Sequence, residues 1–204
     1  MTAGDERAAW TPTTHDWLRD EDAAHIQRIR DERGRYENGG RRHQILEVLA
    51  YADDEAEHRG RRGNAIVRLA RDGDVSIADD GRGTDTRRDA SGAVVRKPIM
   101  ATADLRFFET SAPPLLPDGL PRRGISTVAA LSSVLTHENR RVDGAWSQEY
   151  RCGRPTSELI SLPPTAGTGT TVIFRSELGA PTGLTDADLL AFRWLEIRYV
   201  DESH

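Results

Sequence analysis

The chain has 204 residues, a formal net charge of −5 and a hydrophobic share of 37%, values that suit one domain with a sizeable core. The acidic balance argues against autonomous nucleic-acid binding, and no apolar run approaches the roughly 18 residues of a membrane span. Because the N-terminus lacks an apolar secretory signal and Cys152 is the single cysteine, we expect a cytoplasmic protein without disulfides or a metal centre.

The first 20 residues are predicted to form a flexible arm ahead of a domain that spans 21–204. This segment is polar, with Trp10 and Trp17 as its large apolar anchors. Such an arm becomes ordered only where it docks on something. The domain is expected to begin with a helix over 21–32.

A second helix is predicted over 42–58, where apolar residues recur at helical spacing and form a stripe. On the opposite face, Glu47, Tyr51 and Asp54 stand at i, i+4 and i+7. Side chains at this spacing share one face of a helix. The row is therefore a candidate ligand-facing surface. The stripe itself consists of Ile45, Leu46, Leu49, Ala52 and Ala56.

Two strands follow, over 64–70 and 74–78, joined by a hairpin turn at 71–73. The second alternates apolar and polar residues, which predicts a half-buried strand. It ends at the turn Asp79-Asp80-Gly81-Arg82-Gly83, whose glycines let the backbone approach a ligand closely. A buried carboxylate is costly unless it is hydrogen-bonded, and the exocyclic amine of a purine is one partner that satisfies it.

The rest of the chain is predicted to alternate loops, helices and strands. A hydrophilic loop reaches Arg96, a short helix covers 99–103, and a loop rich in proline and glycine, 106–123, has the length of a lid. A buried helix is expected over 124–135, and a helix capped by Thr185 closes the chain. Strands are expected over 136–141, 145–151, 158–162 and 170–175. This order favours one layer of helices on one mainly antiparallel sheet.

Four segments carry a family resemblance, and they are 40–49, Ser76-Ile-Ala-Asp-Asp-Gly-Arg-Gly83, 119–126 and Thr168-Gly-Thr-Thr-Val-Ile-Phe174. In this order they resemble the GHKL ATPase domain, and most closely the N-terminal ATPase domain of the DNA gyrase B protein and topoisomerase IV. The second and fourth segments match closely, whereas the others match in part. The resemblance covers the chain from about Asp20 onward. It implies the Bergerat fold, a two-layer α/β sandwich with a mixed, mainly antiparallel sheet.

The resemblance implies that adenine is recognised at the end of the second strand. Asp79 matches the aspartate that holds the adenine amine, and Thr170 matches the threonine that supports the same edge through water. Gly81 and Gly83 belong to the turn that the base approaches. Arg82 matches one member of an ion pair across the pocket mouth, Glu55 the other, and Arg141 falls near a pocket-rim arginine.

The resemblance also implies a phosphate side. Glu47 matches the carboxylate that activates the attacking water, and a carboxylate can accept that proton. Gly119 and Gly124 match glycines of the lid, where amides at the start of the following helix hold phosphate oxygens. ATP is the implied cofactor.

Departures from the family pattern fall on this phosphate side. Tyr51 replaces an asparagine that ligates magnesium in the family, and a phenol is a poor ligand for Mg²⁺. Ala50 replaces the preceding aspartate. The lid has Arg122 where a glycine is expected, with Arg123 beside it, and Asp85 replaces a proline. Mg²⁺ is therefore doubtful as a cofactor.

Two interpretations of the arginines stay open. Arg122 and Arg123 either replace the magnesium charge and clamp phosphate, or they face water beside a decayed site. Local alternatives also stay open. Glu47 can be a solvated helix residue, Asp79 can bond its own turn, and Arg82 with Glu55 can be a rim pair of little energetic weight.

The leading hypothesis is a stand-alone protein that binds an adenine nucleotide, with ATP hydrolysis weak or lost. If ATP is hydrolysed, Glu47 is expected to act as the general base and Arg122 or Arg123 to stabilise the phosphate. Because the chain ends soon after Val200, we expect no transducer domain and no complete topoisomerase subunit. One alternative is a regulatory protein that dimerises through its arm and lid with itself or with a gyrase-type partner. Another is a pocket recruited for small-molecule biosynthesis, with Tyr51, Glu47 and the arginines in acid–base roles.

Overall fold

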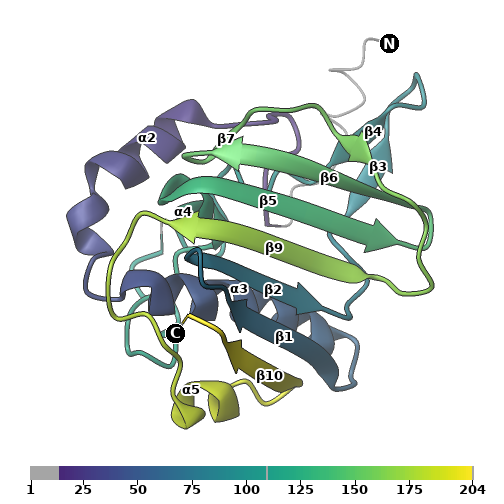
Figure 1. Ribbon diagram of the computed structural model, residues 1–204. Coiled ribbons are helices and arrows are strands. Elements are labelled where there is room, and N and C mark those ends of the chain that lie inside the picture. Colours follow the sequence, from purple (N-terminus) through teal and green to yellow (C-terminus); the bar gives the residue numbers. More distant parts are fainter. Residues whose placement is uncertain (1–13, 109, 204) are drawn as a thin grey trace.

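An eight-stranded sheet forms one layer of the protein, and helices cover one of its faces (Figure 1). The computed structural model describes residues 14–108 and 110–203. The strands of the large sheet are β1 (Gly63–Leu69), β2 (Asp74–Asp79), β5 (Ser132–Arg141), β6 (Gly144–Arg151), β7 (Arg154–Pro155), β8 (Ile160–Ser161), β9 (Gly169–Ser176) and β10 (Leu195–Asp201).

The sheet has the order β10-β1-β2-β9-β5-β6-β7, and β8 pairs with β6. β10 runs parallel to β1, whereas the other pairs in the sheet are antiparallel. The predicted fold class, a two-layer α/β sandwich with a mixed, mainly antiparallel sheet, is confirmed. Strands β2 and β9 are neighbours although they lie far apart in the sequence, and this pairing brings the two best-matching motifs side by side.

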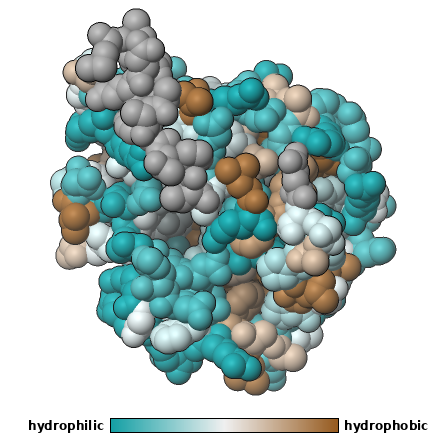
Figure 2. Space-filling view, turned by 180° about the vertical axis from the view of Figure 1, so that it is seen from behind, coloured by the Kyte–Doolittle hydropathy of each residue, from teal (hydrophilic) through white to brown (hydrophobic). Residues whose placement is uncertain are grey.

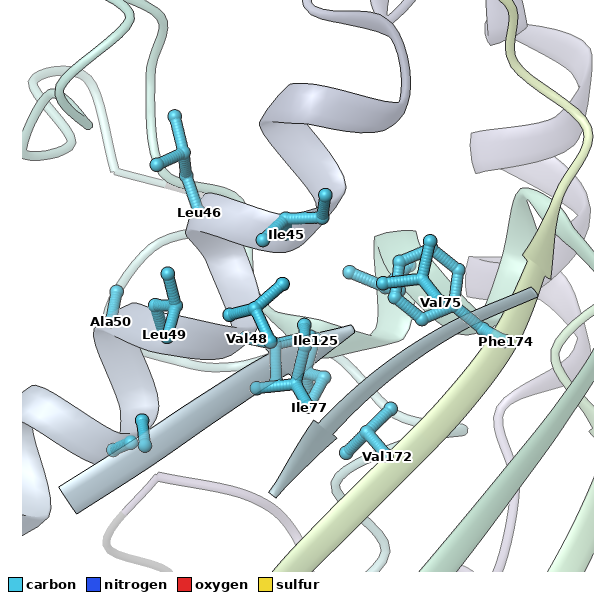
Figure 3. Close-up of a cluster of buried hydrophobic side chains, with 14 of the residues drawn as sticks. Ile45, Leu46, Val48, Leu49, Ala50, Val75, Ile77, Ile125, Val172 and Phe174 are labelled. Atoms are coloured by element: carbon cyan, nitrogen blue, oxygen red, sulfur yellow. The ribbon is translucent and has the colours of Figure 1, made fainter. Parts of the chain in front are cut away.

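The helical layer is built around α3 (Gly40–His58), which lies behind β1 and β2 in Figure 1. Ile45 and Leu49 on α3 are fully buried, as are Val75 and Phe174 from the sheet, and all four belong to the core cluster in Figure 3. Full burial of each such side chain contributes about 1.5–3 kcal/mol. The other helices are α2 (Ala23–Asp31), a 3-10 turn (Arg33–Arg35), α4 (Ile125–Ala130) and α5 (Asp186–Ala191).

Helix α3 is buried on more than one side. Its predicted apolar stripe is buried, and so are Glu47 and Val48 on other faces. The sheet covers one side of the helix, while the segment that leads into α4 contacts Glu47 on another. This enclosure explains why a glutamate in mid-helix has no exposed surface.

Two predicted helices differ from the structure. The segment 99–103 forms turns, because it is short and the carbonyl of Pro98 accepts a turn hydrogen bond from Ala101. The helix predicted over 124–135 ends at Ala130, and residues from Ser132 onward join β5. Pairing with β6 and β9 satisfies the backbone there in place of helical bonds.

Some strands of the structure are absent from the elements that the sequence predicts. The hydrophilic loop before Arg96 contains a hairpin of β3 (Thr86–Arg88) and β4 (Val94–Arg96). The apolar run after Thr185 predicts one helix, but α5 ends at Ala191 and β10 begins at Leu195. β10 is defined by its partner β1, a contact between distant segments that local periodicity does not contain.

The N-terminal arm predicted for residues 1–20 lies largely outside the described residues. Its described part packs on the domain, since Trp17 is 2% exposed and carries the Arg87 guanidinium 4.4 Å from its ring centre. The carbonyl of Thr14 accepts a hydrogen bond from the backbone of Leu105.

The helix side of the molecule is mainly hydrophilic, with apolar residues in small separate groups (Figure 2). Across 14–108 and 110–203, no helix combines the length and the apolar character that a bilayer crossing requires.

Gly169, at the start of β9, is a position where the fold requires glycine. Its φ is +148°, and a Cβ there would lie 2.0 Å from the carbonyl oxygen of Asp79. We predict that Gly169→Ala lowers the free energy of unfolding by about 3 kcal/mol or more, because backbone must move to relieve the clash. Urea denaturation measures this change. Gly167→Ala is the matched control, since open space surrounds Gly167, and equal effects of the two substitutions would contradict the prediction.

Candidate functional site

A pocket of about 440 Å³ lies between α3 and the sheet. Val48, Ile125 and Val172, which Figure 3 places around the same part of the core, form its apolar wall. The polar lining comes from α3, the end of β2, β9 and two loops. Its charged members are Asp54, Glu55, Asp79, Arg82, Asp85, Lys97 and Arg106.

Asp79 stands at the floor of this pocket. Its Oδ1 accepts hydrogen bonds from the backbone of Gly81 at 2.8 Å and of Thr170 at 3.3 Å. Among the described residues, Oδ2 has no hydrogen-bond partner and is free to accept one. Burial raises the pKa of Asp79 to about 6, against the opposing effect of the two backbone donors. The bond to Gly81 is an Asx-type turn contact, but it uses one oxygen and leaves the other for the pocket.

The neighbouring carboxylate has a different environment. Asp80 accepts hydrogen bonds from the backbone of Asn64 at 2.8 Å and from its side chain at 2.7 Å. Although burial opposes the change, these bonds lower the pKa of Asp80. The Asp-Asp pair therefore divides into one pocket residue and one residue that ties β2 to β1.

The turn after Asp79 is held at the pocket mouth. Arg82 makes a bidentate pair with Glu55, at 2.6 and 3.0 Å. The Arg82 side chain is 54% exposed, so this rim pair contributes little to stability. Gly83 has a φ of +80°, its carbonyl accepts a bond from Arg141, and a Cβ on it would lie 2.6 Å from Oδ1 of Asn139.

Glu47 points to the segment that leads into α4. Its Oε1 accepts from the backbone of Arg123 at 2.5 Å, and its Oε2 accepts from Gly124 at 3.2 Å. It has no exposed surface, so the alternative of a solvated helix residue is wrong.

His43 lies one turn before Glu47 and completes a buried chain of polar contacts. Its Nε2 is 3.6 Å from Oε1 of Glu47, and its Nδ1 is 2.8 Å from Asp118. Burial lowers the pKa of His43, but the hydrogen bond to Asp118 and the nearby carboxylate of Glu47 outweigh it and raise the pKa to about 9. The imidazole is therefore charged at neutral pH.

Tyr51 takes part in a second set of buried contacts. Its hydroxyl donates to Oδ2 of Asp104 at 2.6 Å and accepts from the backbone of Ile125 at 3.3 Å. Burial, with the nearby charge of Asp104, raises the pKa of Tyr51 well above its usual value. The phenol is therefore a neutral, engaged group at physiological pH.

The two lid arginines separate in the structure. Arg122 is 6% exposed and pairs with Asp54 at 2.9 and 3.1 Å. Its guanidinium lies 4.2 Å from the ring centre of Phe107, so the alternative in which Arg122 faces water is wrong. Arg123 instead lines another pocket, of about 330 Å³, beside α2. The structure does not bring Arg123 into the pocket of Asp79.

The lid glycines have different surroundings. Gly119 has a φ of +79° in a turn closed by its bond to the carbonyl of Leu116, and it is not part of the pocket lining. Gly124, with a φ of +98°, has Asp104 3.1 Å and the Tyr51 hydroxyl 3.3 Å from the position of a Cβ. A side chain at Gly124 would therefore displace the groups that surround the start of α4.

Several site residues escape sequence-based prediction. His43 shares the face of Glu47 four residues away, and this spacing could have identified it. Asp104, Arg106 and Asp118 come from loops without periodicity, so no local pattern marks them. His15 also lines the pocket, from a segment that the sequence predicts to be a flexible arm.

The position at which the resemblance implies a magnesium ligand does not supply one. Tyr51, at the position where the resemblance implies a magnesium ligand, is hydrogen-bonded to Asp104 and Ile125. Within 14–108 and 110–203, no cluster of three histidine, cysteine, aspartate or glutamate residues could hold a metal ion.

The known proteins that resemble this chain in sequence and in structure belong to one family. The chain is 34% identical over 164 residues to the B subunit of DNA gyrase from Mycobacterium tuberculosis, covering 80% of this chain and 24% of that protein. It is 31% identical over 189 residues to the B subunit of DNA topoisomerase 4 from Staphylococcus epidermidis, covering 86% and 27%. The chain thus spans about a quarter of the length of these curated relatives.

A solved structure supports the fold. The topoisomerase IV ATP-binding domain of Francisella tularensis, in complex with a small-molecule inhibitor, superposes with a TM-score of 0.62 over 87% of this chain and 51% of that one. The sequence identity is 20%, so this likeness concerns the fold alone. No protein-family model matches the chain.

His43 gives the folded state a pH dependence. Its folded pKa of about 9 lies above the unfolded value of 6.5, so its stabilising effect is complete below pH 6.5 and disappears as the pH rises to 9. We predict that unfolding free energy falls by up to about 3 kcal/mol across this interval, and that His43→Gln removes this fall. Urea titrations at several pH values measure it. His58→Gln, on the exposed end of α3, should behave as wild type; an unchanged profile in His43→Gln would refute the assignment.

Asp79 is predicted to reduce stability when it is ionised. Because its folded pKa of about 6 exceeds the unfolded value of 3.8, the penalty is complete above pH 6 and absent below pH 3.8. Asp79→Asn keeps an acceptor for Gly81 and Thr170, so we expect it to raise stability at pH 7.5 by at most about 3 kcal/mol, with no gain near pH 4. Thermal unfolding at both pH values tests this, and a destabilised variant at pH 7.5 would contradict it.

Proposed function

The chain is homologous to the ATPase domain of the B subunits of DNA gyrase and topoisomerase IV, and we propose that it binds an adenine nucleotide with hydrolysis that is weak or lost. Residues 21–204 would form the binding unit. The homology supports ATP as the ligand class, and the pocket geometry supports the base-recognition half of that assignment.

The proposal rests on one observation: the carboxylate of Asp79 lies at the floor of a pocket with an apolar wall. One oxygen is fixed by Gly81 and Thr170, so the other is held in place to accept the exocyclic amine of adenine. A preorganised acceptor in a buried site discriminates strongly, since a ligand without the donor leaves it unsatisfied. Val48 and Val172 supply the apolar surfaces between which a planar base fits.

The surroundings of Glu47 and Tyr51 support weak hydrolysis. A general base must reach the attacking water, whereas Glu47 has no exposed surface and both of its oxygens are held by backbone hydrogen bonds. The position of the expected magnesium ligand carries Tyr51, which does not fit Mg²⁺. Phosphoryl transfer in this class of site depends on such a metal.

Neither alternative has an observation that favours it. For dimerisation through the arm and the lid, residues 1–13 of the arm lie outside the described part of the chain. Acid–base chemistry by Tyr51 is disfavoured because the raised pKa of its hydroxyl keeps it protonated near neutral pH.

Adenine recognition is tested by Asp79→Asn with Asp80→Asn as the matched control. The first replaces the acceptor by an amide that can turn its NH₂ to the ligand, and we predict at least a 30-fold loss of affinity, about 2 kcal/mol. The second changes the same charge on the β1 side and should leave affinity within about threefold. Isothermal titration with ATP and, separately, with adenosine measures both. Unchanged affinity in Asp79→Asn for every adenine ligand would refute the proposed function.

A further inference from the structure

We infer that the pocket recognises an adenine nucleoside and gains no affinity from a triphosphate. This inference rests on the proposed function and states which part of an adenine nucleotide the pocket recognises, namely the base and the sugar. It follows from the contacts of the segment that leads into α4, from the pairing of the arginines around it, and from the charge and polarity of the pocket lining.

The backbone N–H groups that would receive phosphate already have partners. Glu47 accepts from Arg123 and Gly124 through its two oxygens, and the hydroxyl of Tyr51 accepts from Ile125. A phosphate at this place would have to displace a buried carboxylate whose Oε1 also lies 3.6 Å from Nε2 of the charged His43. The displaced carboxylate would lose its donors in a buried position, which is strongly unfavourable.

The arginines near this segment are paired in the same manner. Arg122 bonds Asp54 through two nitrogens, and Arg106 bonds Asp104 through two nitrogens as well. The side chain of Asp104 has no exposed surface. Each pair has one buried partner, Arg122 in the first and Asp104 in the second. A buried charge that loses its partner is strongly unfavourable, so these guanidinium groups do not turn readily to a phosphate.

The charge of the lining disfavours a polyanion. Four carboxylates line the pocket against three cationic side chains, and at pH 7 Asp79 is ionised despite its raised pKa. Lys97 has no carboxylate within ion-pair distance among the described residues, but Asp85 and Asp104 are near enough to act on its charge. A neutral nucleoside enters this field without repulsion, whereas a triphosphate carries several negative charges into it.

The unpaired ring nitrogen of His15 in the pocket suits a hydroxyl. His15 is 1% exposed, lines the pocket, and has no hydrogen-bond partner for its Nε2 among the described residues. Burial lowers the pKa of His15 to about 3, so the ring is neutral. A neutral imidazole nitrogen pairs with a sugar hydroxyl and supplies no charge for a phosphate.

The direct experiment is isothermal titration of the wild-type protein with adenosine, AMP and ATP, with and without Mg²⁺. We expect adenosine to bind at least as tightly as AMP and ATP under both conditions. ATP that binds about ten times more tightly than adenosine, with or without Mg²⁺, would overturn the inference and leave the proposed function intact. Absence of binding by every adenine compound would overturn both.

Glu47→Ala tests whether Glu47 is the group that keeps phosphate out of the site. It frees the N–H groups of Arg123 and Gly124, so we expect the ratio of ATP to adenosine affinity to rise about tenfold. Glu57→Ala, at an exposed position of the same helix, should leave the ratio unchanged. A ratio that stays constant in Glu47→Ala would show that Glu47 does not exclude phosphate, and circular dichroism confirms that both variants fold.

His15→Ala tests the contact with the sugar. The variant should weaken adenosine binding about tenfold and leave the binding of free adenine unchanged, because adenine has no hydroxyl. Equal losses for adenosine and adenine, or no loss for either, would contradict this contact.

Discussion

A buried carboxylate must have its lone pairs satisfied, and this constraint governs both halves of the site. Asp79 and Glu47 lie on opposite elements, β2 and α3, and both are shielded from bulk water. Glu47 has a backbone donor for each oxygen, whereas Asp79 has two donors on one oxygen. Both oxygens of Glu47 thus have a backbone partner, whereas Oδ2 of Asp79 has no hydrogen-bond partner among the described residues.

The topology explains why the incomplete carboxylate stands at the end of β2. The pairing of β2 with β9 brings the backbone of Thr170 to Asp79 across 91 residues of sequence. The close approach requires glycine at position 169, since any side chain there would overlap the Asp79 carbonyl. Asn139 of β5 then holds the following turn through the backbone of Thr84. The sheet thus fixes the acceptor, and α3 supplies the opposite wall.

Much of the fold follows from local patterns in the sequence. The apolar stripe of α3 and the alternation in β2 identify these elements close to their observed bounds, because each pattern is local to one element. β10 and the early end of α4 escape such patterns, because pairing with distant strands decides them. A single sequence does not contain these contacts in any local period.

Within the site, too, local motifs are readable from the sequence, whereas contacts between distant segments are not. Asp79, Gly83 and Thr170 form a motif with fixed spacing, and the structure brings them together around one pocket. Arg122 is expected from the sequence to face either phosphate or water. The structure excludes water, because Asp54 and Phe107 enclose the guanidinium. Its partners come from a helix and a loop that meet only in the folded chain. Residue type alone therefore indicates a cationic site where the fold has a neutral ion pair.

The directions of the pKa shifts separate the two halves of the site in physical terms. Asp104 and Asp118 have lowered pKa values despite their burial, because Arg106 and His43 pair with them. The pKa of Asp79 is raised, because burial is not offset by any cation. Groups that the protein has already satisfied stabilise the folded state and resist displacement. The group that it has left at an energetic disadvantage is the one from which a ligand gains most, and a neutral base with a hydrogen-bond donor relieves that disadvantage without adding charge.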